Sequence, residues 1–278
     1  MSEKNQGRRQ TARERLQQER QRVKARDKRR RTLIVVAAVV GVLGLAAVVG
    51  VIAANSGKKK SGSEAGSLLA PAGAQGKDQL AIPVGASDAP STLTVWEDFR
   101  CPICAQFETA VRDTVHELER TGQVKIEYHL ATIIDGNMGG TGSLRAANAA
   151  ACAQDVGKFV PYHDVLYQNQ PPETDDAFGD NSRLIELAGK VDGLDTPEFR
   201  RCVEDGKHDS WVEKSNTVFR HSGFRGTPTV LLNGESIFPD KGGERISAPN
   251  LKKWVEEANK GKKPGTERST PSPASPAS

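Results

Sequence analysis

An uninterrupted apolar run is the feature that most constrains how this 278-residue chain can fold. Residues 33–54 comprise 22 consecutive positions without a charged or strongly polar side chain. An α-helix of that length rises about 33 Å, which is enough to cross the hydrocarbon core of a bilayer. A buried helix of a soluble protein would instead show polar residues on one face. The run therefore predicts a transmembrane helix at 32–54, and any globular part must lie outside it.

The charges around this run predict how it lies in a membrane. Residues 1–31 contain 13 Lys and Arg against four Asp and Glu, a net charge of +9 in a chain whose total is +4. Because cationic flanks stay in the cytoplasm, we expect a single-pass protein with a cytoplasmic basic arm and an extracytoplasmic remainder. Cleaved signal peptides have apolar stretches of only about 7–15 residues, so an uncleaved signal-anchor is favoured. Nucleic-acid binding by the arm is the less favoured alternative, and no nucleic-acid partner is expected.

Composition divides the remainder into three parts. Residues 55–79 are rich in Ser, Gly, Ala and Lys without an apolar period, which is typical of a flexible linker. Residues 261–278 are polar and rich in Pro and Ser, which predicts a disordered tail. Between them, residues 80–260 carry strand and helix patterns and are predicted to form the folded domain.

The order of these patterns favours an α/β domain. A strand–helix–strand order predicts a parallel pair, and Asn233-Gly234 after the third strand predicts an antiparallel pair. We therefore expect a mixed sheet flanked by helices, with a helical insertion at about 140–222. Strands are predicted at 92–99, 124–131 and 229–232, and helices at 103–120, 143–155, 159–168, 182–188, 197–205, 209–221 and 249–258.

Cys101 and Cys104 form a Cys-x-x-Cys pair where a predicted strand ends and a predicted helix begins. A sulfur at a helix N-terminus faces free backbone N–H groups and the positive end of the helix dipole, which lowers the pKa of a thiol. We expect Cys101 to be the exposed nucleophile and Cys104 the buried partner that resolves mixed disulfides. Pro102 fits the first helical turn without losing a hydrogen bond, and Ile103 completes the dipeptide between the cysteines. The arrangement indicates thiol–disulfide exchange.

Two other uses of this pair stay open. Half of a zinc site would need a second Cys-x-x-Cys or a His pair at suitable spacing. The segment from His116 begins like a zincin motif but ends in Arg120, so no metal and no cofactor are expected. A purely structural disulfide is the second alternative.

Further motifs accompany the redox pair. Residues 81–85 read AIPVG, residues 97–104 read EDFRCPIC, and residues 226–230 read GTPTV. With a helical insertion between them, these motifs resemble the DsbA-type branch of the thioredoxin superfamily, and more closely the membrane-anchored DsbA-like proteins of Gram-positive actinobacteria. The resemblance implies a thioredoxin fold, an initial strand in 81–85, and a cis Thr227–Pro228 bond that faces the redox pair. Such a bond would leave the backbone of Thr227 free to pair with an extended substrate.

The chain departs from this family in two ways. Many relatives carry a buried acid six residues before the first redox cysteine, where this chain has Val95. Glu97 lies on the same strand face and either substitutes for that acid in proton transfer or is a solvated or capping carboxylate. The strongest oxidants of the family have a His between the cysteines, whereas this chain has Pro-Ile. A less oxidising potential is therefore expected.

Cys152 and Cys202 both lie in the predicted insertion and are too far apart in sequence for a local redox motif. A structural disulfide is the favoured role, with two unpaired thiols as the alternative, and the resemblance implies such a bridge. Closing a loop of about 50 residues would stabilise the domain by roughly 4 kcal/mol in the chain-entropy model.

The resemblance implies an enzyme that forms disulfides in exported Cys-containing proteins. Its implied electron partner is a membrane protein of the DsbB or vitamin K epoxide reductase type. A reductase or isomerase of the same fold, and a non-catalytic scaffold that binds polypeptides, are the alternatives.

Overall fold

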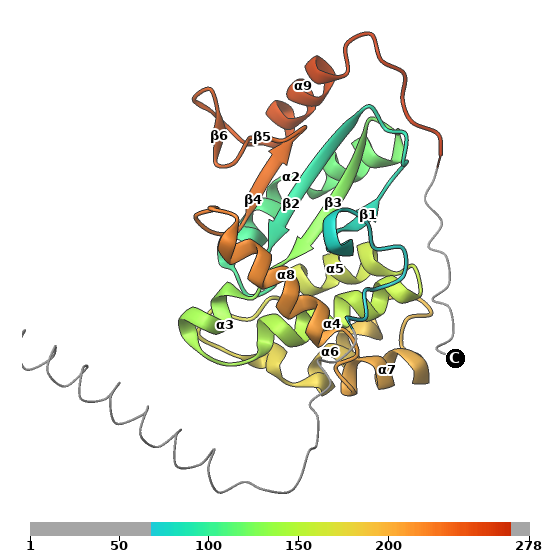
Figure 1. Cartoon of the computed structure of the whole chain (residues 1–278), viewed down its shortest axis with the longest axis vertical. Helices are drawn as coiled ribbons and strands as arrows, with labels where there is room; N and C mark the ends of the chain where they lie inside the picture. The colour runs from blue at the N-terminus through green and yellow to red at the C-terminus, as the bar shows by residue number, and fades with distance from the viewer. Residues whose placement is uncertain (1–67, 268–278) are drawn as a thin grey trace, which may run out of the picture. The chain divides into compact units, whose positions relative to one another are not determined.

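The computed structural model describes residues 68–267, which are built around a five-stranded sheet with the order β1-β3-β2-β4-β5 (Figure 1). β2 and β3 are parallel, whereas β1 pairs antiparallel with β3 and β4 pairs antiparallel with β2. The predicted mixed sheet is therefore confirmed, as is the antiparallel β4–β5 hairpin through Asn233-Gly234. The strands are β1 (Ile82–Val84), β2 (Ser91–Glu97), β3 (Val124–Leu130), β4 (Thr229–Leu232), β5 (Glu235–Ser236), and a separate pair, β6 (Asp240–Lys241) with β7 (Glu244–Arg245).

The residue pattern of each strand explains its place in the sheet. Along β3, buried and half-buried residues alternate without interruption, as expected for a strand with one face against the core. In β2 the last three residues are all buried because the strand runs into the helical layer. In the β4–β5 turn, Asn233 and Gly234 have φ values of 52° and 85°, the left-handed backbone that an Asn-Gly hairpin requires.

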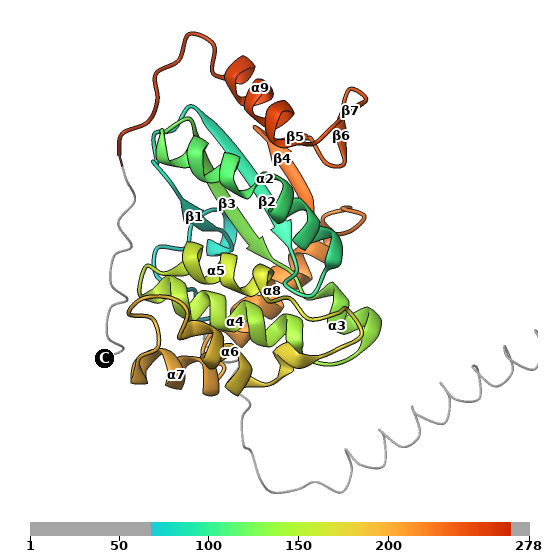
Figure 2. The same ribbon diagram turned by 180° about the vertical axis from the view of Figure 1, so that it is seen from behind.

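The helices form two groups. Helix α2 crosses one face of the sheet and buries one apolar stripe there, with α9 beside it, while the insertion helices pack below the ends of β2 and β3 (Figures 1 and 2). The sequence patterns did not predict α3, which belongs to the insertion. The insertion therefore begins before the predicted start at about residue 140. The helices are α2 (Pro102–Arg120), α3 (Ile133–Met138), α4 (Gly142–Asp155), α5 (Phe159–Gln168), α6 (Asn181–Ala188), α7 (Pro197–Glu204), α8 (Asp209–His221) and α9 (Ala248–Ala258), with 3-10 turns η1 (Lys77–Gln79) and η2 (Ala177–Gly179).

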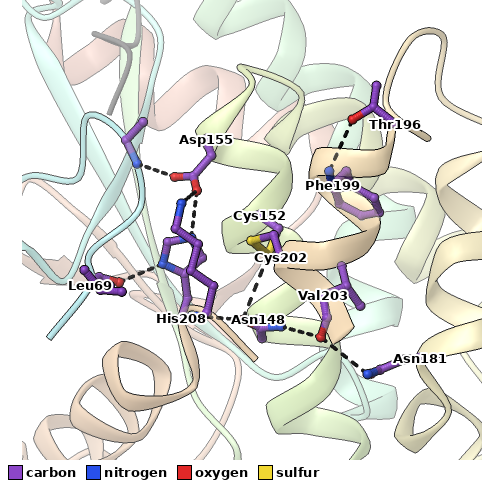
Figure 3. Close-up of a disulfide and its surroundings, with 12 residues drawn as sticks. Leu69, Asn148, Cys152, Asp155, Asn181, Thr196, Phe199, Cys202, Val203 and His208 are labelled. Atoms are coloured by element: carbon purple, nitrogen blue, oxygen red, sulfur yellow. Dashed lines mark hydrogen bonds and ion pairs between the residues drawn. A yellow bond between two sulfur atoms is a disulfide. The ribbon is translucent and has the colours of Figure 1, made fainter. Parts of the chain in front are cut away.

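A disulfide between Cys152 and Cys202 links α4 to α7 within the insertion, with the two Cα atoms 5.9 Å apart (Figure 3). Beside it, His208 is fully buried and lies between the Leu69 carbonyl and the Asp155 carboxylate, at 2.7 and 2.9 Å. The pairing predicted for these cysteines is confirmed, and the alternative of two unpaired thiols is wrong.

The segment 68–79, predicted as the end of a flexible linker, is packed against the insertion. The Ala72 N–H donates to Asp155, the Ala72 carbonyl accepts from Gln154, and the Trp211 indole donates to the Gln79 carbonyl. Side chains of the insertion thus hold the backbone of this segment in place. The composition of the segment does not reveal these hydrogen bonds.

Residues 261–267, predicted as the start of a disordered tail, also pack on the domain. The backbone N–H groups of Thr266 and Glu267 donate to Asp88, both at 2.8 Å. Within 68–267, no helix is long and apolar enough to span a membrane. The predicted basic arm, the transmembrane helix at 32–54 and the remainders of the linker and tail lie outside the described residues.

Candidate active site

The redox pair lies at the start of α2, directly below the end of β2. Cys101 is the N-cap residue of α2 and Pro102 its first helical residue, as predicted. The Cys101 thiol donates to the Thr227 carbonyl at 3.3 Å, and the Thr227–Pro228 peptide bond is cis. The structure therefore brings together the two motifs that are 126 residues apart in sequence.

The two thiols have opposite acidities. A hydrogen bond from Cys104 lowers the pKa of Cys101 most, burial opposes it, and the Thr227 side chain and two helix N–H groups bring the pKa to about 6. Burial raises the pKa of Cys104 well above its ordinary value, and the hydrogen bond to Cys101 raises it further. Near neutral pH, Cys101 is therefore the thiolate and Cys104 the proton-bearing partner.

Cys101 is less exposed than predicted. Only 5% of its surface is accessible, against none for Cys104, because the Thr227 carbonyl lies against its sulfur. Ile103 is 45% exposed and presents an apolar side chain beside the pair.

A cavity of about 430 Å³ lies next to the cis-proline loop. Phe224, Leu231 and Phe238 give it apolar walls, and Arg225 adds one positive charge. Pro228 lines it as well, and so does Thr227, whose carbonyl accepts from Cys101.

Glu97 is fully buried beneath the pair, and one of its oxygens is 2.8 Å from His163 Nε2. The other oxygen has no hydrogen-bond partner among the described residues. The interpretation of Glu97 as a solvated or capping carboxylate is therefore wrong. Val95, at the position where relatives carry an acid, is a buried core residue.

A second acid, Glu108, lies close to the same histidine. It follows Cys104 by one helical turn on α2 and is 4% exposed. Burial raises the pKa of Glu108 to about 8, against the opposing charge of His163. Burial also disfavours a charged His163, but the charge of Glu97 and hydrogen bonds to Asp164 and Glu97 outweigh it and raise the His163 pKa to about 10. The cluster is thus a protonated histidine held between carboxyl groups.

Among residues 68–267, two clusters have ligand atoms close enough to share a metal ion. Glu97, Glu108 and His163 form one, but both ring nitrogens of His163 already face carboxylates. His208 with the two cysteines of the α4–α7 bridge forms the other, but a disulfide provides no thiolate ligand. Neither arrangement resembles a prepared metal site.

Asp98 and Arg100, which flank Phe99 just before the redox pair, are also buried. Burial raises the pKa of Asp98 to about 7, although the N–H groups of Ile134 and Arg100 donate to it. Gln170 donates to the carbonyls of Phe99 and Cys101. The sequence patterns did not predict these contacts of Asp98, Arg100 and Gln170. Only Glu108 had a usable signal, its four-residue spacing from Cys104.

Comparison with known proteins identifies the family. The thioredoxin family model matches residues 77–257. Disulfide bond formation protein D of Bacillus subtilis is 24% identical over 184 residues, covering 64% of this chain and 77% of that protein. The oxidised DsbA structure from Mycobacterium tuberculosis has a TM-score of 0.55 and 29% identity, covering 64% of this chain and 92% of that one. The reduced DsbG structure from the same organism has the same score and identity, covering 64% and 86%. The chain therefore belongs to the thioredoxin family and is a DsbA-like thiol-disulfide oxidoreductase.

Proposed function

We propose that this protein is an oxidase that forms disulfides in exported Cys-containing proteins outside the cytoplasm. The observation that carries the proposal is the placement of Cys101 at the N-terminus of α2 beside Cys104, which lowers the pKa of Cys101 from an ordinary 9.0 to about 6. At pH 7 this difference stabilises the reduced pair by about 1.4 kcal/mol, which raises the reduction potential by about 30 mV. A pair that is more stable when reduced is a better oxidant of other thiols.

The reaction would transfer two electrons from the substrate to the pair. A substrate thiolate attacks Cys101 Sγ of the oxidised pair, and Cys104 leaves as a thiolate that takes up a proton. A second substrate thiolate then attacks the substrate sulfur of this mixed disulfide, and Cys101 leaves. The low pKa of Cys101 makes it the better leaving group, so the second step favours release of an oxidised substrate.

Other features support the proposed location and partners. The apolar run at 33–54 after a strongly basic arm supports a signal-anchor with the redox domain outside the cell membrane. The α4–α7 disulfide supports an oxidising compartment. An oxidase there needs an electron acceptor, and a membrane partner of the DsbB or vitamin K epoxide reductase type would be within reach of an anchored enzyme.

The reduction potential of the full chain in detergent tests this proposal. The protein is equilibrated with glutathione buffers, alkylated, and analysed by mass spectrometry, with Cys101→Ser as the control that cannot form the bond. A value between about −120 and −200 mV supports an oxidase, whereas one near about −270 mV indicates a reductase. The absence of reversible exchange would leave only the scaffold.

A further inference from the structure

The turn between β2 and α2, residues 98–101, is held by side chains from the helical insertion. Gln170, which follows α5, is half-buried and donates its amide N–H groups to the Phe99 carbonyl at 2.8 Å and to the Cys101 carbonyl at 3.0 Å. One insertion residue thus fastens the backbone on both sides of Arg100.

Arg100 itself extends from this turn into the insertion and is only 2% exposed. Its Nη1 lies 2.7 Å from Asp135 and 2.8 Å from Asp176, and donates to the Gly139 carbonyl at 2.9 Å. Its Nη2 donates to the Glu173 carbonyl at 3.1 Å. Two loops of the insertion therefore converge on one guanidinium group, whose planar fork suits several acceptors at once.

The carboxylates that bind Arg100 also organise the start of α4. Asp135 accepts from the N–H groups of Ser143 and Leu144, and Asp176 accepts from those of Thr141 and Gly142.

The space around Arg100 is closely fitted. A Cβ on Gly142 would lie 2.9 Å from the Arg100 side chain and 2.6 Å from Asp176. From the turn itself, Asp98 accepts from the Ile134 N–H of α3. The turn and the insertion therefore form one hydrogen-bonded unit.

We propose that Gln170 and Arg100 are positioning residues, through which the helical insertion holds the 98–101 turn so that Cys101 Sγ stays over the N-terminus of α2. The thiolate of Cys101 is stabilised by N–H groups of that helix end, and such stabilisation depends on distance and direction. Loosening the turn should move the sulfur away from these donors. This inference rests on the proposed function and adds that the insertion sets the reactivity of the pair.

The test compares two glutamines in the full chain. Gln170→Leu removes the two bonds to the turn, whereas Gln154→Leu removes an amide bond from the insertion to the Ala72 carbonyl and keeps the bonds to the turn. The rate of Cys101 alkylation by iodoacetamide is measured from pH 4 to 9, alongside urea stability and the glutathione equilibrium. We expect Gln170→Leu to lower the alkylation rate at pH 5 about threefold, which corresponds to about 0.65 kcal/mol, and to move the midpoint of the pH profile upward. Gln154→Leu should keep the wild-type profile even if its stability falls.

A second pair of variants checks the arginine. Arg100→Gln should shift the alkylation profile in the same direction, and Arg145→Gln, which removes an Arg–Asp pair elsewhere in the insertion, should not. If Arg100→Gln does not fold, Gln170→Leu decides alone. Identical pH profiles for Gln170→Leu and Gln154→Leu would overturn the inference. If the proposed function is wrong, the wild-type protein itself will have a reduction potential outside the oxidase range in the glutathione equilibrium. That result is distinct from any difference between the variants.

Discussion

Replacing Glu97 by glutamine would remove a buried negative charge while keeping the size of the side chain. Glu97 is fully buried, and its carboxylate is 2.8 Å from His163 Nε2. Breaking a buried ion pair by removing one partner typically costs about 3–5 kcal/mol, because it leaves a buried charge uncompensated. The amide oxygen can still accept from His163, and Asp164 remains beside the ring. We therefore expect the free energy of unfolding to fall by about 3 kcal/mol at pH 7, near the lower end of that range.

The pH dependence of this loss has a definite sign. Although burial disfavours the charged ring, Glu97 and Asp164 raise the pKa of His163 to about 10, above the value of about 6.5 for a free histidine. A raised pKa contributes stability that is complete below the unfolded value and is lost as the pH rises through the folded value. The difference in stability between wild type and Glu97→Gln should therefore be largest below about pH 6.5 and narrow toward pH 10.

Urea unfolding from pH 5 to 10, followed by tryptophan fluorescence, measures this difference. The exposed Glu256, also a glutamate in a helix, provides the matched control as Glu256→Gln, with an expected change within about 0.5 kcal/mol. A loss below about 1 kcal/mol for Glu97→Gln, or one that stays constant from pH 5 to 10, would refute the buried ion pair with His163.

Three further predictions concern other parts of the domain. Replacing Cys152 and Cys202 together by alanine opens a loop of 50 residues and should lower urea stability by about 4 kcal/mol, and no change in midpoint would contradict a structural role. Burial raises the pKa of Glu108 to about 8, so this group should make wild-type stability fall as the pH rises from 4.5 to 8. In a urea series Glu108→Gln should make that fall smaller, while the shares of Asp98 and His163 remain, and an unchanged slope would contradict the raised pKa of Glu108. Gly122 has φ 69°, and a Cβ there would clash with the Gly265 carbonyl oxygen, so Gly122→Ala should lower stability by at least about 1–2 kcal/mol and expose residues 261–267 to proteolysis. An unchanged cleavage pattern would contradict the packing of residues 261–267 on the domain.

The periodic part of the fold could be predicted from sequence because each helix or strand repeats its own burial pattern. Helices α5 and α8 and strand β4 have the bounds that the patterns predicted. The short α3 has too few residues for such a pattern, and β1 has only three, one of them proline. The segments at 68–79 and 261–267 are fixed by contacts with distant side chains, such as Asp155 and Asp88, so their own composition misidentified them as linker and tail.

At the site, sequence could predict what depends on local spacing. Cys101, Cys104 and Pro102 follow from a helix start, and the cis bond at Thr227–Pro228 followed from a resemblance. His163 could not be found in this way, because its partner Glu97 is 66 residues distant and nothing in the surrounding residues marks a buried ion pair.

The opposite acidities of the two redox cysteines share one cause, the hydrogen bond between them, and each cysteine has further causes of its own. For Cys101, the Thr227 side chain and the N–H groups at the start of α2 add to the effect of Cys104 in lowering the pKa. Gln170 holds the backbone carbonyl of Cys101, and with it the position of the residue at the helix end. Cys104 is fully buried, and the charge of Glu97 adds to the effect of burial on its pKa. Loosening the turn should therefore raise the pKa of Cys101, whereas neutralising Glu97 should lower that of Cys104. Alkylation of each cysteine in the two single variants and the double variant compares these changes, and the hydrogen bond between the two sulfurs predicts that their effects are not additive.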